Sequence, residues 1–350
     1  MTTVLSLCSS IEEEFPVLCS CWISNSEIIV AGGGGTAKTG VPNRVVLLKV
    51  SSDLKMQTVY KMDFTSGVYS LCCDPGRRFI AFCVNGTCHI FQIARASPYF
   101  RQICVVPLPQ DKGDQLSLAF SPSAGVIIGF EKGYVYHCSI AGHLDCMAQI
   151  DHSVRHIDVR EDDICITSES EFYFGKLNSH ALTLESCTLQ SCYLKKPQIL
   201  QSNLVVIPDQ SRLGALIVAQ KQRTWSFKMT LRSFKTPVTS CHLEPFFLDP
   251  ETDTIVYRGL IGTGAGYVAS VLVNSCWNHP KVLGSSKPVH LSVTTLSGFS
   301  DSSLFISTGL ERTVALWKQS SRGNRGFLAL ICGALIVASF SICLVRFLTK

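Results

Sequence analysis

The stretch SLCCDPGRRFIAFCVNGTCHIFQI, residues 70–93, decides the fold, because its pattern occurs again later in the chain. It contains a short alternating strand, a turn at Pro75, a second strand, a tight turn at residues 85–87 and a third strand. Residues 117–140, SLAFSPSAGVIIGFEKGYVYHCSI, follow the same order, and residues 303–318, SLFISTGLERTVALWK, repeat its second half. β-rich runs separated by Pro, Gly and polar turns are typical of antiparallel sheets.

Weaker copies extend this repeat over most of the chain. They lie at residues 16–50, 154–177, 204–229 and 238–273, which brings the total to about seven units. A spacing of about 40 to 50 residues is the period of propeller blades. The run from Thr313 to Trp317 looks like the strand that closes a WD-repeat blade. Each four-stranded blade has two apolar faces, and a closed ring of blades buries both.

The sequence therefore predicts an all-β fold, a seven-bladed WD-repeat β-propeller. A pair of β-sandwich domains is the alternative that short strands and turns also permit. From its position alone, the apolar run at residues 2–7 is expected to form the outer strand of the last blade and to close the ring.

The C-terminal part has a different pattern. Residues 326–345, GFLALICGALIVASFSICLV, carry no charge, and as a helix they would span about 30 Å, the thickness of a bilayer core. The N-terminus has no basic region typical of a secretory signal. We therefore expect a tail-anchored protein with a cytosolic propeller at 1–318, a linker at 319–325, a transmembrane helix at 326–345 and a short luminal tail at 346–350. A buried core helix is the alternative for the apolar run. The shortness of the span favours the endoplasmic reticulum.

Charge and cysteine content exclude other classes. The formal net charge is only +5, so nucleic acid is not an expected partner. The 17 cysteines are odd in number and lie within apolar runs, which indicates reduced thiols rather than a disulfide framework.

Residues 31–43, AGGGGTAKTGVPN, resemble a phosphate-binding loop at first. However, Ala37 stands where the second glycine of that motif belongs, and Pro42 and a β-branched strand follow where a helix is required. The dinucleotide fingerprint fails for the same reason. Compared with the turns of the second and third units, this connection has about seven extra residues, so it is an enlarged hairpin.

Two interpretations of the enlarged hairpin remain open from the residues alone. It is either an inserted tip with no role, or a probe with freely turning glycines at its base and a stiff apolar tip that docks into a partner. In the second case Pro42 extends Val41 and presents its side chain at an exposed place.

Three other stretches are weaker candidates. His137 to Cys146 in HCSIAGHLDC has no usual zinc spacing. His152, His156 and Asp158 could serve acid-base chemistry, but the start of a fourth blade, with polar residues that tie blades together, is the better explanation. Residues 262–267, GTGAGY, are expected to form a hairpin turn. No hydrolase motif is present, and we expect neither an enzyme nor a small-molecule substrate.

The combination of WD-repeat units, a first hairpin reading GGGGTAKTGVPN and a C-terminal anchor resembles a known family. This is the family of endoplasmic-reticulum guanine-nucleotide exchange factors for the Sar-type small GTPase of the COPII coat, the prolactin-regulatory-element-binding protein family. The glycine-rich hairpin carries the resemblance, which extends over essentially the whole chain, although residues 178–237 match only in general pattern.

The resemblance implies a mechanism without covalent chemistry, in which the hairpin docks on the switch regions of the GTPase and loosens the nucleotide. It implies an exchange loop made of Gly32, Gly33, Gly34, Gly35, Lys38, Thr39, Gly40, Val41, Pro42 and Asn43. It also implies a potassium ion in this loop, with Asn43 and nearby backbone carbonyl groups as candidate ligands. Activated GTPase would then recruit COPII at the endoplasmic-reticulum membrane. The alternative is a tail-anchored propeller scaffold without exchange activity. A transcription factor is disfavoured by the near-neutral propeller and the anchor.

Overall fold

The computed structural model describes residues 2–322, except for 37–39, 95, 122–124, 179–181, 190–192, 211–214, 222–224, 230–235, 275, 277–280 and 300–302. The predicted membrane span and luminal tail lie outside the described residues. Within the described part, no helix is long and apolar enough to cross a membrane.

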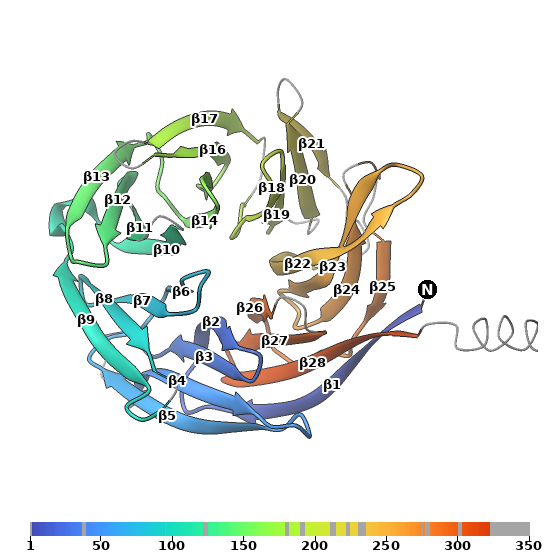
Figure 1. The fold of residues 1–350 in the computed structure, drawn as a ribbon, viewed down its shortest axis with the longest axis horizontal. Coiled ribbons are helices and arrows are strands. Elements are labelled where there is room, and N and C mark those ends of the chain that lie inside the picture. The colour runs from blue at the N-terminus through green and yellow to red at the C-terminus, as the bar shows by residue number, and fades with distance from the viewer. Residues whose placement is uncertain are drawn as a thin grey trace, which may run out of the picture.

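Seven four-stranded antiparallel sheets stand around a central axis, so the predicted β-propeller is confirmed (Figure 1). The alternative of two β-sandwiches is wrong, because the sheets follow one another around a ring. Each sheet, or blade, occupies the place of one predicted repeat unit. In six blades the strands follow in chain order from the innermost to the outermost. The last blade differs, because its outermost strand comes from the N-terminus.

The strands of the blades have the following bounds, in order from the inner to the outer strand. Blade 1 contains β2 (Val17–Ser24), β3 (Glu27–Gly32), β4 (Asn43–Val50) and β5 (Met56–Phe64). Blade 2 contains β6 (Leu71–Cys73), β7 (Phe79–Val84), β8 (Thr87–Ile93) and β9 (Phe100–Pro107). A 3-10 helix, Gln110–Lys112, follows it. Blade 3 contains β10 (Gln115–Ser121), β11 (Gly125–Phe130), β12 (Tyr134–Ser139) and β13 (Leu144–Gln149). Blade 4 contains β14 (His156–Arg160), β15 (Asp163–Thr167), β16 (Glu171–Leu177) and β17 (Leu182–Thr188).

The remaining blades complete the ring. Blade 5 contains β18 (Gln198–Gln201), β19 (Leu204–Asp209), β20 (Ala215–Lys221) and β21 (Trp225–Met229). Blade 6 contains β22 (Val238–Asp249), β23 (Thr254–Thr263), β24 (Val268–Val273) and β25 (Lys281–Ser285). Blade 7 contains β26 (Val293–Gly298), β27 (Leu304–Gly309), β28 (Thr313–Arg322) and β1 (Thr2–Glu12).

The N-terminal strand closes the ring, as predicted from its position. β1 pairs antiparallel with β28, from Thr2 opposite Arg322 to Glu12 opposite Thr313 (Figure 1). β28 also continues beyond the boundary that we expected at residue 318. It reaches Arg322 because β1 extends far enough to pair with it.

Apolar residues on both faces of each blade hold the ring together. In β3, Ile29 and Ala31 belong to the cluster between blades 1 and 2, whereas Ile28 and Val30 belong to the cluster between blades 7 and 1. Successive side chains of a strand point to opposite faces, so a strand with two covered faces reads as a continuous apolar run. The described residues form one such cluster at each of the seven blade interfaces. The 14 described cysteines are free thiols, several of them inside these clusters, as the sequence indicated.

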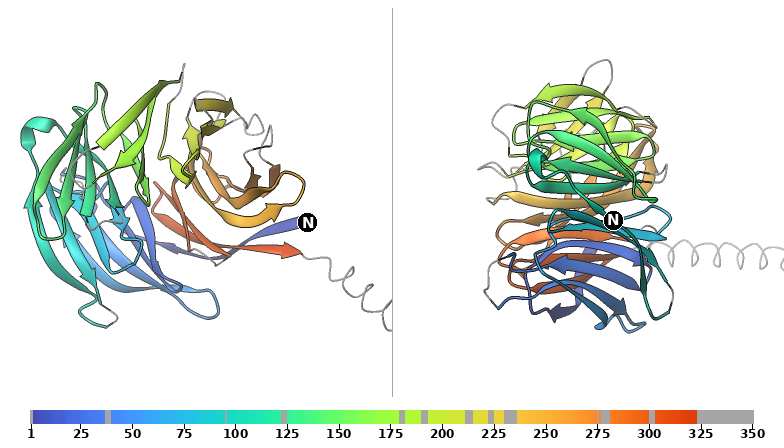
Figure 2. Two further views of the ribbon diagram at one scale, coloured as in Figure 1. Left: turned by 45° about the horizontal axis from the view of Figure 1, so that its top comes forward. Right: turned by 90° about the vertical axis from the view of Figure 1, so that its left-hand side faces the viewer.

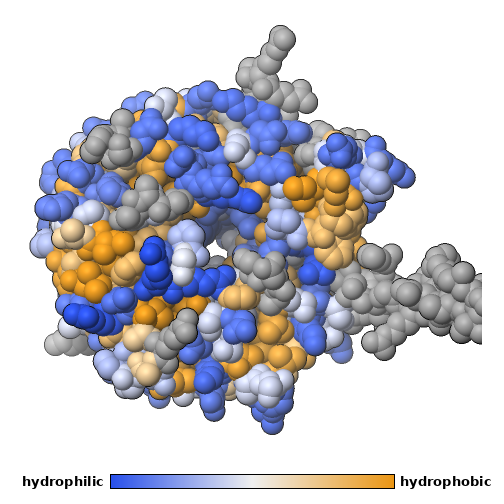
Figure 3. Space-filling view, in the orientation of Figure 1, coloured by the Kyte–Doolittle hydropathy of each residue, from blue (hydrophilic) through white to orange (hydrophobic). Residues whose placement is uncertain are grey.

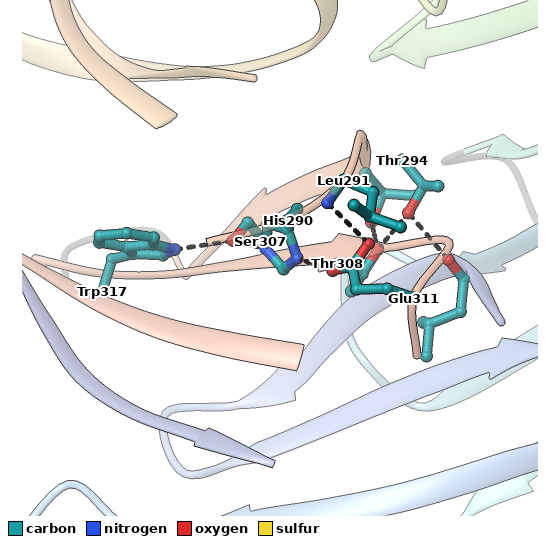
Figure 4. A network of polar contacts seen from close by, with 9 residues as sticks. His290, Leu291, Thr294, Ser307, Thr308, Glu311 and Trp317 are labelled. Atoms are coloured by element: carbon teal, nitrogen blue, oxygen red, sulfur yellow. Dashed lines mark hydrogen bonds and ion pairs between the residues drawn. The ribbon is translucent and has the colours of Figure 1, made fainter. Parts of the chain in front are cut away.

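Blade 7 is also held by a buried polar network (Figure 4). Trp317 Nε1 donates to Ser307 Oγ at 2.7 Å, and Ser307 Oγ lies 2.7 Å from Nε2 of His290. The other ring nitrogen of His290 contacts Glu311, which also accepts a hydrogen bond from the backbone N–H of Leu291 at 3.1 Å. These contacts tie β27, β28 and the connection that enters blade 7 into one unit.

The ring has two faces that carry different connections. Because the strands of a blade alternate in direction, the connection after the second strand and the crossing to the next blade lie on the same face. We call this face the glycine-loop face, since it carries the connection between β3 and β4. The sheets are inclined around the axis (Figure 2), and a central opening with a mainly hydrophilic rim passes through the ring (Figure 3).

Candidate functional site

The glycine loop, residues 33–42, joins β3 to β4. It is ten residues long, whereas the equivalent connections of the other blades have two to five residues. The predicted enlarged hairpin is therefore confirmed. The loop leads into a strand, so the N-terminal helix amides that a phosphate-binding loop requires are not provided by this connection.

A buried asparagine holds the base of the loop. Asn43, the first residue of β4, is 9 % exposed. Its side-chain Nδ2 donates to the carbonyl oxygen of Gly35 at 2.9 Å, and its Oδ1 accepts from the N–H of Gly35 at 3.0 Å. This pair of hydrogen bonds fixes the chain at two points eight residues apart. The asparagine side chain thus fixes the start of the loop at Gly35.

Gly32 and Gly33 are glycines because the chain is closely packed around them, and not because the backbone turns freely there. This corrects our expectation of a freely turning base. A Cβ on Gly32 would lie 2.0 Å from the carbonyl oxygen of Pro16. Gly33 has a φ of +139°, and a Cβ there would lie 2.2 Å from Oδ1 of Asn43. Both residues are buried, and Gly33 donates from its N–H to Pro16 at 3.2 Å. Only glycine permits this approach of three chain segments.

The tip of the loop differs from the expected exposed apolar probe. Val41 is only partly exposed and packs against the cluster between blades 7 and 1, and Pro42 is also partly buried. The correction has a physical reason: apolar side chains of the last blade lie beside the loop, so Val41 buries part of its surface against them. Gly40 is exposed with a φ of +75°, and nothing lies within 4 Å of a Cβ placed there. Lys38 and Thr39 lie outside the described residues.

Tyr69 stands beside the loop and was not predicted from the sequence. It lies in the crossing from blade 1 to blade 2, is 59 % exposed, and its hydroxyl would be 2.9 Å from a Cβ on Gly35. A cavity of about 710 Å³ extends from it and is lined by Thr36, Asn85 and Gln110 among others. The only sequence signal was an aromatic residue in a Ser/Gly-rich connection.

Further large apolar side chains are exposed on the same face. Tyr193 is 60 % exposed in the crossing to blade 5, Leu291 is 77 % exposed in the crossing to blade 7, and Leu310 is 52 % exposed in the turn before β28. Exposed apolar groups rimmed by polar residues are typical of protein contact surfaces.

Charged groups anchor the first residues of β4. The guanidinium of Arg44, next to Asn43, contacts the carboxylates of Glu14 and Asp63. Glu14 belongs to the connection between β1 and β2, and Asp63 to β5. These contacts raise the pKa of Arg44, chiefly through its hydrogen bond to Asp63. They fix β4 at the point where the loop ends.

The candidates for acid-base chemistry receive separate partners. His152 lies 3.3 Å from Glu171, whereas Asp158 accepts a hydrogen bond from the N–H of Ile199 in the next blade at 2.8 Å. This contact confirms that polar residues at the start of the fourth blade tie adjacent blades together. Residues 264–267 connect β23 to β24, which confirms the predicted turn.

Asn43 is a described side chain at the loop that could serve a cation. Its Oδ1 uses one lone pair for the N–H of Gly35, and the second is of the neutral carbonyl type that potassium prefers. The residue present therefore fits the ion. Among the described residues, no group of three or more His, Cys, Asp or Glu side chains could hold a metal ion.

Comparison with known proteins supports the fold. No protein-family model matches the chain. Among solved structures, it is similar to the WD40 β-propeller domain of Doa1, with a TM-score of 0.66 and 12 % sequence identity. The match covers 91 % of this chain and 98 % of that chain. At this identity the likeness shows the fold alone, a WD40-type seven-bladed propeller.

Proposed function

We propose that this propeller is a membrane-anchored guanine-nucleotide exchange factor for a Sar-type small GTPase, acting at the endoplasmic reticulum to start COPII vesicle formation. One observation carries the proposal: the single enlarged hairpin among the seven equivalent connections of the ring has a base fixed by the buried Asn43. A WD40 propeller as such hosts many functions, so the argument rests on this loop and its residues.

The surroundings of the loop support a protein partner. The exposed ring of Tyr69 and the neighbouring cavity of about 710 Å³ offer an aromatic anchor beside a concave surface. Binding energy at interfaces concentrates on such residues. Exposed Leu291 and Leu310 lie on the same face, toward blade 7. We place the GTPase on this side, in contact with the glycine loop and Tyr69.

An exchange factor needs only a difference between its affinities for the two nucleotide states of the GTPase. A surface that binds the nucleotide-free GTPase more tightly than the loaded form shifts the equilibrium towards nucleotide release. The role of this chain is to present a loop whose base is held by Asn43, so less ordering free energy is lost on docking. A potassium ion held by Asn43 and nearby carbonyl groups would supply further rigidity to the loop.

The proposal is tested by nucleotide release. The full-length chain in liposomes is mixed with a Sar-type GTPase that carries a fluorescent guanine nucleotide, in potassium buffer. We expect acceleration, a loss of at least about tenfold for Val41→Ala with Asn43→Ala, and a similar loss for Tyr69→Ala. Replacement of potassium by sodium should slow release.

Asn203→Ala is the matched control, because it changes an exposed asparagine in the connection between β18 and β19, which lies on the other face of the ring. Its release rate should stay close to that of the native chain, and the melting temperature of each variant shows whether it is folded. Absence of acceleration, or equal rates in the loop variants, would favour the alternative, a membrane-anchored propeller scaffold without exchange activity.

A further inference from the structure

The glycine-loop face of the central channel contains a second concave site. A cavity of about 570 Å³ lies where the inner strands begin, and its lining comes from residues around the ring, including Leu18, Ser70, Leu116, His156 and Ser292. This volume is in the range that holds small ligands. The cavity is distinct from the one beside the glycine loop, although Tyr69 and Leu116 border both.

The charges of this cavity have one sign. Lys195 and Lys196 line it, and the described lining contains no aspartate or glutamate. His156 also lines it but is neutral, because burial, together with the two lysine charges, lowers its pKa to about 3. Both lysines lie in the segment that leads into β18. Neither forms an ion pair with a described carboxylate. Two ammonium groups at the mouth of a channel without acidic partners create a positive potential there.

Neighbouring acidic groups compensate this positive charge only in part. Arg155 is paired with Glu169, so that carboxylate is already neutralised. Burial lowers the pKa of Lys195, and the charge of Arg155 lowers it further. Asp158 accepts a hydrogen bond from Ile199 and lines the cavity towards the other face, which Lys196 also borders. The charge of Lys196 opposes the burial that raises the pKa of Asp158.

The cavity also offers hydroxyl groups. Eight serines and threonines contribute to its lining, together with Gln210. Ser70 and Ser292 are partly buried at the mouth, and within the described chain their hydroxyls have no hydrogen-bond partner. Hydroxyls and ammonium groups together suit a ligand that carries both negative oxygens and hydroxyls.

We propose that the mouth of the central channel on the glycine-loop face binds a compact phosphate-bearing polyol, with Lys195 and Lys196 contacting its phosphates and Ser70 and Ser292 contacting its oxygens. The cavity is large enough for one small ligand of this kind. The same headgroup chemistry occurs in free sugar and inositol phosphates and in phosphorylated lipids, and the test distinguishes these two sources.

The test is isothermal titration of the full-length chain in phosphatidylcholine nanodiscs with inositol trisphosphate, inorganic phosphate and neutral inositol. We expect saturable binding of inositol trisphosphate, weaker binding of phosphate and no binding of neutral inositol. Lys195→Gln with Lys196→Gln should weaken binding at least about tenfold. Bound ligand should raise the melting temperature of the native chain and not of this variant.

Lys49→Gln with Lys55→Gln is the matched control, because it removes the same charge from exposed lysines at the end of β4 and in the turn after it. Equal binding by both double variants would overturn the proposal, as would absence of saturable binding. Vesicles that contain phosphatidylinositol bisphosphate serve as competitors: loss of the inositol trisphosphate signal assigns the site to a lipid headgroup, and an unchanged signal assigns it to a soluble ligand. Nucleotide exchange plays no part in this readout.

Discussion

In blade 7 the connection after β27 has three residues, and its Glu311 side chain turns inward to His290. In blade 1 the equivalent connection after β3 has ten residues, and its inward contact is made at the base, between Asn43 and Gly35. The hairpin of blade 7 continues the buried network of Trp317 and Ser307 (Figure 4). The hairpin of blade 1 is fixed only at its base, and residues such as Thr36 and Gly40 are exposed.

The hairpin of blade 7 contributes to the stability of the fold, whereas the hairpin of blade 1 adds a feature to the surface. Polar groups that are buried and fully paired specify one packing of a blade, and their loss is costly. A long connection on a fixed base adds a surface feature at small cost to the ring, because loop length itself changes the closure entropy only slowly. Substitutions in the two hairpins should therefore affect different measurements.

The largest effect is expected in blade 7. Trp317 is 2 % exposed and donates a hydrogen bond to Ser307, so Trp317→Ala should lower the free energy of unfolding by about 3 to 5 kcal/mol. Denaturant unfolding measures the change. Leu310→Ala, in the exposed turn of the same hairpin, should change stability by no more than about 0.5 kcal/mol. A loss below about 1 kcal/mol for Trp317→Ala would contradict the importance of the network.

An intermediate effect is expected at the base of the glycine loop. Gly33→Ala places a Cβ against Asn43 at a φ of +139°, so it should cost about 3 kcal/mol and, on the proposed function, should also slow nucleotide release. Gly40→Ala has open space and should cost about 1 kcal/mol from backbone strain alone. Equal losses in the two variants would show that the close approach of Asn43 has no energetic role.

The smallest effect concerns pH. Burial lowers the pKa of His290 below its ordinary 6.5, against the opposing effect of its hydrogen bond to Glu311. The unfolded chain then binds the proton more readily than the folded chain, so stability should be full above about pH 6.5 and decrease as the pH falls below it. Unfolding from about pH 7.5 to about pH 5.5 should show this decrease, and His290→Gln should reduce the slope.

Other buried groups also change the pH dependence of stability, and the direction of each pKa shift gives the direction of its effect. Burial also lowers the pKa of His89, His137 and His156, the last to about 3, which adds to the acid-induced loss. Burial raises the pKa of Glu13 and Asp158, and these carboxyls oppose the loss because their protonated forms are favoured in the folded chain. An unchanged slope in His290→Gln would show that the network does not carry the effect.

The ring could be predicted from the sequence because each blade repeats one order of apolar runs and turns. A strand such as β3, covered on both faces, keeps its apolar character through the whole run, and tight turns mark its ends. The end of β28 was not predictable to the residue. Its last four residues extend as a strand because β1 continues beside them, and such long-range pairing leaves little local signal.

The candidate site was predicted in part. The length of the glycine loop follows from a comparison of the repeat units, but the inward turn of Val41 depends on a cluster shared with the last blade. Tyr69 could not be recognised, because its exposure is set by the crossing between two blades. The cavity with Lys195 and Lys196 is assembled from the starts of inner strands far apart in the chain, so no local motif reveals it.

The pairing of β1 with β28 also sets an order of events during synthesis. β1 finds its partner only after about three hundred further residues have been made. Until then it is an unpaired edge with exposed N–H and C=O groups, the kind of segment that pairs with foreign strands. The ring can therefore close only after β28 has been made.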